Sequence, residues 1–511
     1  MAQGKEARWK RVGGAAALAL LAGHPALAQV TPEEVWQNWQ DVTKGYGQTM
    51  TAASETRDGD TLTIEGLSIK QNQDGVVVDA TIDEVNFTDN GDGTVEITMS
   101  DSYPVKMTLP ADTQGEGPTN LTIAISQPGV VLTVGGTPTD TSYEFEAPTL
   151  GFKLEAINGV DAGAVDVTAN VTLTAVTGSY EVTSVEGGKA VDSSFTSQSL
   201  ALTVVAKDPD TQSDVRVVAT IADIESATTG TFVGIDLMAT NMAQALRSGF
   251  AVDGGFTHGA MSFDLDVTEG GKPTKVTARA TGGGMTVAMD ESGFVYGLNG
   301  TGTAITVSGP EIPFPEAKVT YGEIAFNLAM PMLASDTPSN FSVLTRLVDL
   351  AVSEEIWGMI DPTGAVPHDP ATVILDTKGT ARLTVDLVDE AAMATLGNAP
   401  PGELNSLDIT ELRATVAGAE LTGTGALTFD NTDLATFGGM PTPTGKVDLK
   451  LVGGNALLDR LVAIGMLTAE DVGGMRMMLS MFANAGAAPD ELNSTLEFKD
   501  KGFYANGQRL Q

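Results

Sequence analysis

The chain of 511 residues has no cysteine, only three histidines, and aromatic residues at only 5% of its positions. Without cysteine it can form no disulfides and carry no lipid-modified N-terminal cysteine, so the fold must be held together by its core. Basic residues are also scarce, because 28 lysines and arginines stand against 66 acidic residues. No patch of positive potential persists beside this excess of negative charge. This excludes nucleic acid as a partner and disfavours attraction to an anionic membrane surface.

The first 28 residues have the pattern of a secretory signal peptide. Four basic residues between Lys5 and Arg11 precede a small-to-apolar run over 12–23, and Ala26-Leu27-Ala28 offers small residues before a cleavage point at Gln29. The run is shorter than the roughly 18 residues of a membrane-spanning helix. We therefore expect export and cleavage, with no membrane-spanning segment left afterwards.

Cleavage would remove four basic residues and one acidic residue, which leaves 24 against 65 and a net charge of about −41. Acidic side chains on the outer faces of strands would keep a sheet-rich protein hydrated, also in a salty medium. A calcium-loaded surface is the alternative interpretation of this charge. With 42% hydrophobic and 18% charged residues, the rest of the chain is typical of a folded protein.

Strand-like alternation with turn residues between the segments recurs from about residue 60 onward. The sequence Asp89-Asn90-Gly91-Asp92-Gly93 predicts a hairpin turn rather than a calcium loop, because its acidic residues fall at the wrong intervals. Further strands are predicted at 121–126, 130–134, 143–147, 165–175, 200–206, 215–224, 261–267, 276–280, 285–289, 304–307, 324–328 and 381–388. The predicted fold class is therefore α+β, predominantly antiparallel β, with large curved sheets and a few amphipathic helices packed on them.

A few helices are predicted between the strands. Thr31-Pro32-Glu33-Glu34 is a capping box that opens a helix to about Tyr46. Others are predicted at 233–249, after Ser339 up to Gly358, and in a C-terminal hairpin over 455–466 and 468–485. We predict two lobes, an N-terminal one over 29–249 and a C-terminal one over 250–511, divided near Gly254-Gly255.

Catalytic motifs are missing. Only His258 and His368 remain after cleavage, in separate contexts, and there is no His-Glu-x-x-His helix and no Gly-x-Ser-x-Gly elbow. The glycine clusters at 282–284 and 300–302 precede no helix, so they predict turns and bulges rather than a phosphate loop. Acidic residues are so numerous that no catalytic pair can be chosen. We expect no enzyme activity, no cofactor and no metal.

The last two predicted helices carry more apolar surface than one helix face needs. Methionine suits surfaces that must fit varied apolar shapes, such as lipid or peptide grooves. The alternative is ordinary core, which helical spacing favours for Met478 and Phe482, whereas Met477 and Met481 fall on another face. The candidate ligand-binding residues are Leu461, Met477, Met478, Met481 and Phe482.

The C-terminal sequence resembles a known family. Gly445–Leu449, the Leu457-Leu458 helix, Leu496–Phe498 and Lys501–Gln508 are similar to the close of an uncharacterised alphaproteobacterial family, domain of unknown function 2125, and Thr31–Trp36 after a signal peptide is similar too. The resemblance implies a periplasmic protein of a Gram-negative cell envelope. A looser likeness to AsmA-type sheet-rich envelope proteins implies lipid handling, although the N-terminal anchor of those proteins is missing here.

Two hypotheses follow. The first is a periplasmic protein that binds lipid or another apolar ligand in a groove between a sheet and the C-terminal helices. The second is a structural or assembly protein that contacts other envelope proteins, with a filled core and an exposed apolar patch.

Overall fold

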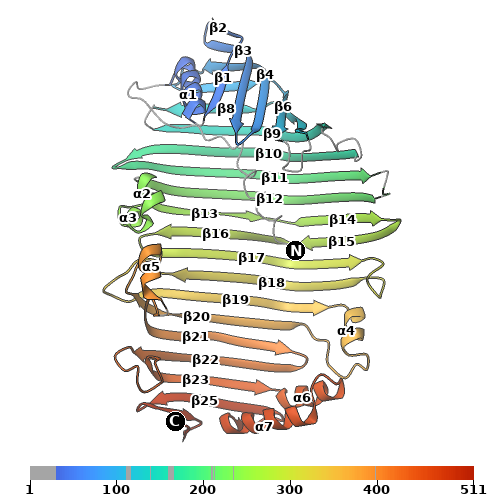
Figure 1. Cartoon of the computed structure of the whole chain (residues 1–511), viewed down its shortest axis with the longest axis vertical. Helices are drawn as coiled ribbons and strands as arrows, with labels where there is room; N and C mark the ends of the chain where they lie inside the picture. The colour runs from blue at the N-terminus through green and yellow to red at the C-terminus, as the bar shows by residue number, and fades with distance from the viewer. Residues whose placement is uncertain are drawn as a thin grey trace. The chain divides into compact units, whose positions relative to one another are not determined.

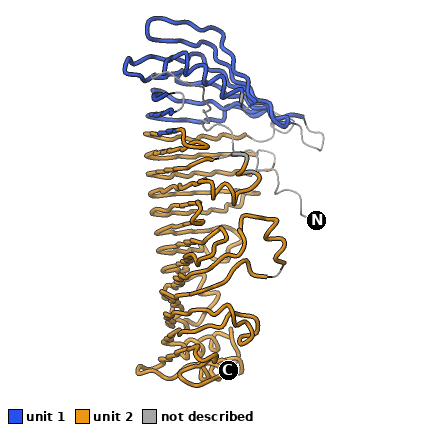
Figure 2. Tube along the Cα trace, turned by 90° about the vertical axis from the view of Figure 1, so that its left-hand side faces the viewer, with its two compact units in different colours: residues 1–163, 179–183 blue, residues 164–178, 184–511 orange. Residues whose placement is uncertain are grey.

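The computed structural model describes residues 30–45, 47–110, 117–137, 140–158, 166–208, 211, 213–233, 235–397 and 399–511. The predicted signal peptide lies outside the described residues. The chain divides into two compact units, coloured separately in Figure 2. Unit 1 comprises residues up to 163 and 179–183, and unit 2 comprises 164–178 and 184–511. The lobe boundary predicted near residue 250 lies within unit 2.

Antiparallel strands dominate both units, as Figure 1 shows, and the helices are few and short. The predicted fold class, α+β with predominantly antiparallel β-structure, is confirmed. Unit 1 begins with helix α1 (Pro32–Gly45). Its strands are β1 (Gln48–Thr51), β2 (Ser54–Asp58), β3 (Thr61–Gln73), β4 (Val76–Asp89), β5 (Val95–Met99), β6 (Ser102–Leu109), β7 (Thr119–Ser126), β8 (Val131–Gly136) and β9 (Thr141–Asn158).

Helix α1 starts at the predicted capping box. The Thr31 backbone amide donates to Glu34 Oε2 at 3.0 Å, and the Glu34 amide donates to Thr31 Oγ1 at 3.3 Å. The apolar face of α1 packs into the core of unit 1, where the ring of Trp39 meets the ring of Phe87 edge-on with centroids 5.1 Å apart. The hairpin predicted at Asp89–Gly93 is confirmed between β4 and β5.

Strand β10 (Asp166–Val185) contributes residues to both units. The other strands of unit 2 are β11 (Gly188–Asp208), β12 (Ser213–Val233), β13 (Ala251–His258), β14 (Met261–Glu269), β15 (Lys272–Ala280), β16 (Gly282–Asp290), β17 (Gly293–Ser308), β18 (Ala317–Met330), β19 (Ser339–Val352), β20 (Ala371–Leu383), β21 (Gly402–Val416), β22 (Ala419–Asp430), β23 (Thr442–Val452), β24 (Asn484–Ala485), β25 (Glu491–Lys499), β26 (Gly502–Ala505) and β27 (Gln508–Arg509).

These strands form one antiparallel ladder. Strand β12 pairs with β11 on one side and with both β13 and β14 on the other, and β16 and β15 then lead to β17. From β17 each strand pairs with the next in sequence as far as β23, which pairs with β25. Among the described residues no second sheet packs on this ladder, so it is a single layer.

The helices of unit 2 lie between strands: α2 (Ile235–Thr240), α3 (Met242–Arg247), α4 (Glu354–Ile360), α5 (Glu390–Leu396), α6 (Gly454–Ala463) and α7 (Ala469–Phe482). The helix predicted at 233–249 is present as the two short helices α2 and α3. The predicted C-terminal hairpin is confirmed as α6 and α7, and Thr468 and Asp471 form the capping box of α7.

Two sequence predictions are wrong. The segment after Ser339 is the strand β19, and only Glu354–Ile360 is helical. The helix-like stripe mixes the two faces of this strand, because Leu344 pairs with Asn327 on the polar side and Leu347 pairs with Ile324 on the apolar side. Asp349, with a φ of 55°, shifts the alternation by one residue only after them. The strand predicted at 381–388 ends at Leu383. Beyond that end, the Asp386 carboxylate accepts hydrogen bonds from Arg247 and from the Ala334 amide.

We expect Phe87→Ala to lower the free energy of unfolding of unit 1 by about 3–5 kcal/mol, because it removes the ring that Trp36 and Trp39 pack against. Urea unfolding followed by tryptophan fluorescence would measure this. Val77→Ala on the same strand is the control: Val77 is 37% exposed, and its truncation should cost less than about 1 kcal/mol. Equal effects would contradict the packing described.

Candidate functional site

Strand alternation gives the unit 2 sheet two different faces. In β17, Phe294, Tyr296 and Leu298 lie on one side and Asn299 lies on the other. Leu298 pairs directly with Phe326 of β18, so both side chains are on the same side. We call the side that carries Leu298 and Phe326 the apolar face and the opposite side the polar face.

Pairing carries the apolar face across ten strands. The Leu298 row consists of Phe256, Met285, Leu298, Phe326, Thr345, Leu375, Leu412, Gly423, Leu449 and Ser494, each paired with the next. Two residues further along each strand, the Ile324 row consists of His258, Gly283, Gly300, Ile324, Leu347, Val373, Ala414, Leu421, Leu451 and Leu492. Neither row contains Asp, Glu, Lys or Arg.

The long strands bend at a left-handed residue without exchanging their faces. Gly302 in β17 has a φ of 57°, and a Cβ added to it would lie 2.6 Å from Thr281 Oγ1. Thr301 Oγ1 also contacts Thr281 Oγ1, at 2.9 Å. Residues 301 and 302 therefore point the same way, and the alternation shifts by one residue. Ile305 consequently returns to the apolar face.

Beyond this bend the apolar face continues over β11, β12, β14, β15 and the adjoining parts of β17 and β18. Two rows of directly paired residues show it. They consist of Leu202, Ala219, Phe263, Ala278, Ile305 and Val319, and of Val204, Val217, Leu265, Val276, Val307 and Ala317. The left-handed residues Asp223 of β12 and Asp349 of β19 mark the same shift in their strands.

Large side chains on the apolar face are only half-buried. Seven of them are 36–46% exposed: Phe256, Leu298, Ile305, Ile324, Phe326, Val373 and Leu375. One margin is covered, because α2 and α3 pack a small core against Val252 and Met289. A contiguous exposed apolar surface of this kind marks a binding site for a ligand, a membrane or another protein.

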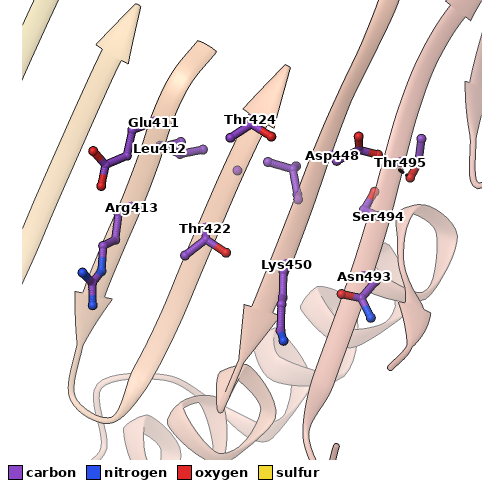
Figure 3. A pocket seen from close by; sticks show the side chains of 12 residues that line it. Glu411, Leu412, Arg413, Thr422, Thr424, Asp448, Lys450, Asn493, Ser494 and Thr495 are labelled. Atoms are coloured by element: carbon purple, nitrogen blue, oxygen red, sulfur yellow. Dashed lines mark hydrogen bonds between the residues drawn. The ribbon is translucent and has the colours of Figure 1, made fainter. Parts of the chain in front are cut away.

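The polar face carries a hollow of about 430 Å³ over β21, β22, β23 and β25 (Figure 3). Threonines of β22 form its floor between longer side chains of the neighbouring strands. Its lining on this face consists of Glu411, Arg413, Thr422, Thr424, Asp448, Lys450, Asn493 and Thr495. Leu412, Gly423, Leu449 and Ser494, which belong to the Leu298 row of the other face, lie between them along the strands and complete the lining. Arg413 pairs with Glu420 at 3.0 Å and Lys450 pairs with Glu491 at 3.3 Å, so both cations of the hollow already have carboxylate partners.

The side chains of the residues predicted to bind a ligand differ in exposure. Leu461 in α6 and Phe482 at the end of α7 are half-buried. Met477, Met478 and Met481 of α7 are 70%, 57% and 57% exposed. Their role in binding stays a prediction. Sequence reasoning missed the apolar face because alternation in one strand does not reveal which residue of the next strand it meets.

A second polar cluster lies in the connection from α4 to β20. The rings of Trp357 and His368 stack with centroids 4.3 Å apart, and His368 Nδ1 lies 2.9 Å from Glu354 Oε2. The buried carboxylate of Asp361 accepts from the Val366 amide at 2.6 Å and from the Thr363 hydroxyl at 2.9 Å. The first of these bonds is the main cause that lowers the pKa of Asp361 to about 2.

Over the part of the chain that the structure describes, no group of three or more histidine and acidic side chains is arranged to hold a metal ion. Within the same residues, no helix combines the length and the apolar character needed to cross a membrane. The candidate site is the apolar face, because its large side chains are exposed.

Residues 267–507 of this chain match the model of a family described as uncharacterized protein conserved in bacteria (DUF2125). The predicted resemblance is confirmed for this DUF2125 region, which extends from β14 to β26 and includes most of the apolar face. The similarity predicted at Thr31–Trp36 lies outside the match. Neither a curated protein nor a solved structure matches the chain.

The exposed methionines lead to a prediction about stability. Met477→Gln with Met481→Gln should change the free energy of unfolding by no more than about 0.5 kcal/mol, because both side chains already lie in solvent. Val472→Ala, on the buried side of α7, should cost roughly 2 kcal/mol. Urea unfolding followed by circular dichroism would compare them, and a large loss for the methionine pair would show that these side chains are packed.

Asp361 leads to a pH-dependent prediction. Its pKa in the folded protein is below the ordinary 3.8, so its hydrogen bonds stabilise the fold above that pH, and the contribution is lost as the pH falls from 3.8 to about 2. Asp361→Asn should lower the thermal midpoint at pH 7, and the difference from the unmodified protein should shrink towards pH 2. Asp369→Asn, at an exposed position of the same connection, should do neither.

Proposed function

We propose that this is an exported, periplasmic and non-enzymatic protein that binds lipid or another apolar ligand on the apolar face of the unit 2 sheet. The observation that carries the proposal is the continuous apolar surface over directly paired strands, with large side chains left 36–46% exposed. The sequence pattern of a signal peptide supports the location. A soluble exported protein would aggregate through such a surface unless something apolar covered it.

The chemistry of the face favours acyl chains over a polar ligand. The Leu298 and Ile324 rows offer aliphatic and aromatic carbon, and their few polar members are Thr345, Ser494 and His258. Ionised headgroups gain nothing there, so they would lie beyond the rows, in water. Hydrocarbon placed on these rows removes apolar surface from water on both partners, at about 25 cal/mol per Å² buried.

An assembly role in the envelope is the second candidate function. Its specific support is α7, whose Met477, Met478 and Met481 side chains point into solvent. Flexible methionine surfaces suit contacts with partners of varied shape. This role needs no ligand on the sheet, so the two functions make different predictions.

The test places charge on the apolar face. Leu298→Asp with Phe326→Asp should abolish most co-purifying lipid, measured by mass spectrometry of an organic extract from the mature protein purified without detergent. A buried carboxylate beside hydrocarbon is strongly disfavoured. Asn299→Asp with Asn327→Asp adds the same charges to the same two strands on the polar face and should leave the lipid unchanged.

A clean extract from the unmodified protein would contradict lipid binding and favour the assembly role. Equal lipid in both double variants would show that the ligand lies elsewhere, and α7 would be the next surface to change. Circular dichroism of each variant would confirm that the sheet is intact.

A further inference from the structure

We propose that acyl chains lie across the strands of the apolar face, in the furrow between the Leu298 row and the Ile324 row, and that one protein holds at least two lipids in series. This inference rests on the proposed function and specifies the class of ligand and how many molecules are bound. Its evidence is the direction, the lining and the length of the furrow.

The geometry of a β-sheet sets the direction. Side chains on one face are about 6.6–6.8 Å apart along a strand, because every second residue points that way, whereas neighbouring strands are only about 4.7–4.9 Å apart. The wider gap lies between rows, so the furrows of this face run across the strands. A hydrocarbon chain fits such a gap lengthwise, with a row of side chains on each side.

The lining of the furrow is apolar over its central part. Phe326 and Ile324 lie two residues apart on β18, one in each row, and Leu375 and Val373 are placed in the same way on β20. All four side chains are 36–46% exposed, so they form walls that a ligand can reach. No ionised group interrupts the rows, so a lipid headgroup must leave the furrow sideways, towards the polar margins.

The length of the furrow exceeds one acyl chain. The rows cross ten strands, from β13 to β25, but Ser494 at the last of them is buried and donates to the Phe482 carbonyl of α7. The eight strand spacings from β13 to β23 amount to about 38 Å. The hydrocarbon core of a bilayer, about 30 Å thick, is two chain lengths, so one chain spans about 15 Å. The furrow therefore has room for more than two chain lengths end to end, which a single phospholipid does not fill.

The test counts lipids by native mass spectrometry after the mature protein is incubated with dioleoylphosphatidylcholine, a lipid without net charge that the acidic surface does not repel. We expect two or more lipids per protein. A limit of one lipid would overturn the serial arrangement and leave the proposed function standing. No bound lipid at all would overturn both.

A variant divides the furrow. Thr345→Lys with Leu375→Asp places an ion pair across β19 and β20, where the two residues are directly paired, and opposite charges at such positions support the sheet. We expect this variant to bind at least one lipid but fewer than the unmodified protein. Complete loss of binding would indicate one continuous occupant, and an unchanged count would place the lipid elsewhere. Either result contradicts the inference.

The control uses the same two strands. Leu344→Lys lies opposite Asp376 on the polar face, so it creates a Lys–Asp pair at the neighbouring position without entering the furrow. Its lipid count should equal that of the unmodified protein. A count reduced as far as in the divided variant would mean that a charge pair anywhere on these strands disturbs binding, and the assignment to the furrow would fail.

Discussion

A single-layer sheet with one apolar face depends on whatever covers that face. In most domains a second layer of helices or strands buries such a surface. In unit 2 the helices α2 and α3 bury one margin of it, around Val252 and Met289, and the end of α7 covers Ser494 at the far end of the Leu298 row. The sheet is held together by backbone pairing between neighbouring strands, so it keeps its shape while much of its apolar surface stays open. That combination makes the surface available for function.

The two faces of the sheet have different physical roles. The polar face carries cross-strand ion pairs such as Arg279 with Asp264 and Arg382 with Glu403, which match charges over the ladder and keep it hydrated. The left-handed residues Gly302 of β17 and Asp349 of β19 shift the alternation in their strands, so that the apolar residues of each long strand stay on one side. Without that shift, residues beyond the bend such as Ile305 would fall among the ion pairs. Local backbone conformation therefore maintains a surface that extends over the whole unit.

Much of the fold could be predicted from the sequence, because capping boxes and alternation are local signals. Thr31 and Thr468 mark the starts of α1 and α7 correctly. The segment 339–352 could not be recognised, since apolar residues on both faces of the strand, such as Leu344 and Leu347, imitate helical spacing. The apolar face could not be predicted from the sequence for a different reason. That Leu298 meets Phe326 depends on the pairing of two strands, and such pairing is a property of the whole sheet rather than of either segment.

The ladder also has a consequence for how such a protein changes in evolution. Each strand from β18 to β22 pairs with the strands directly before and after it in sequence. In architectures of this kind, stability is approximately a sum over neighbouring units. A hairpin can therefore be gained or lost without rebuilding the rest, provided that its apolar residues stay in register. Evolution can therefore lengthen or shorten the open apolar surface by adding or removing one hairpin at a time.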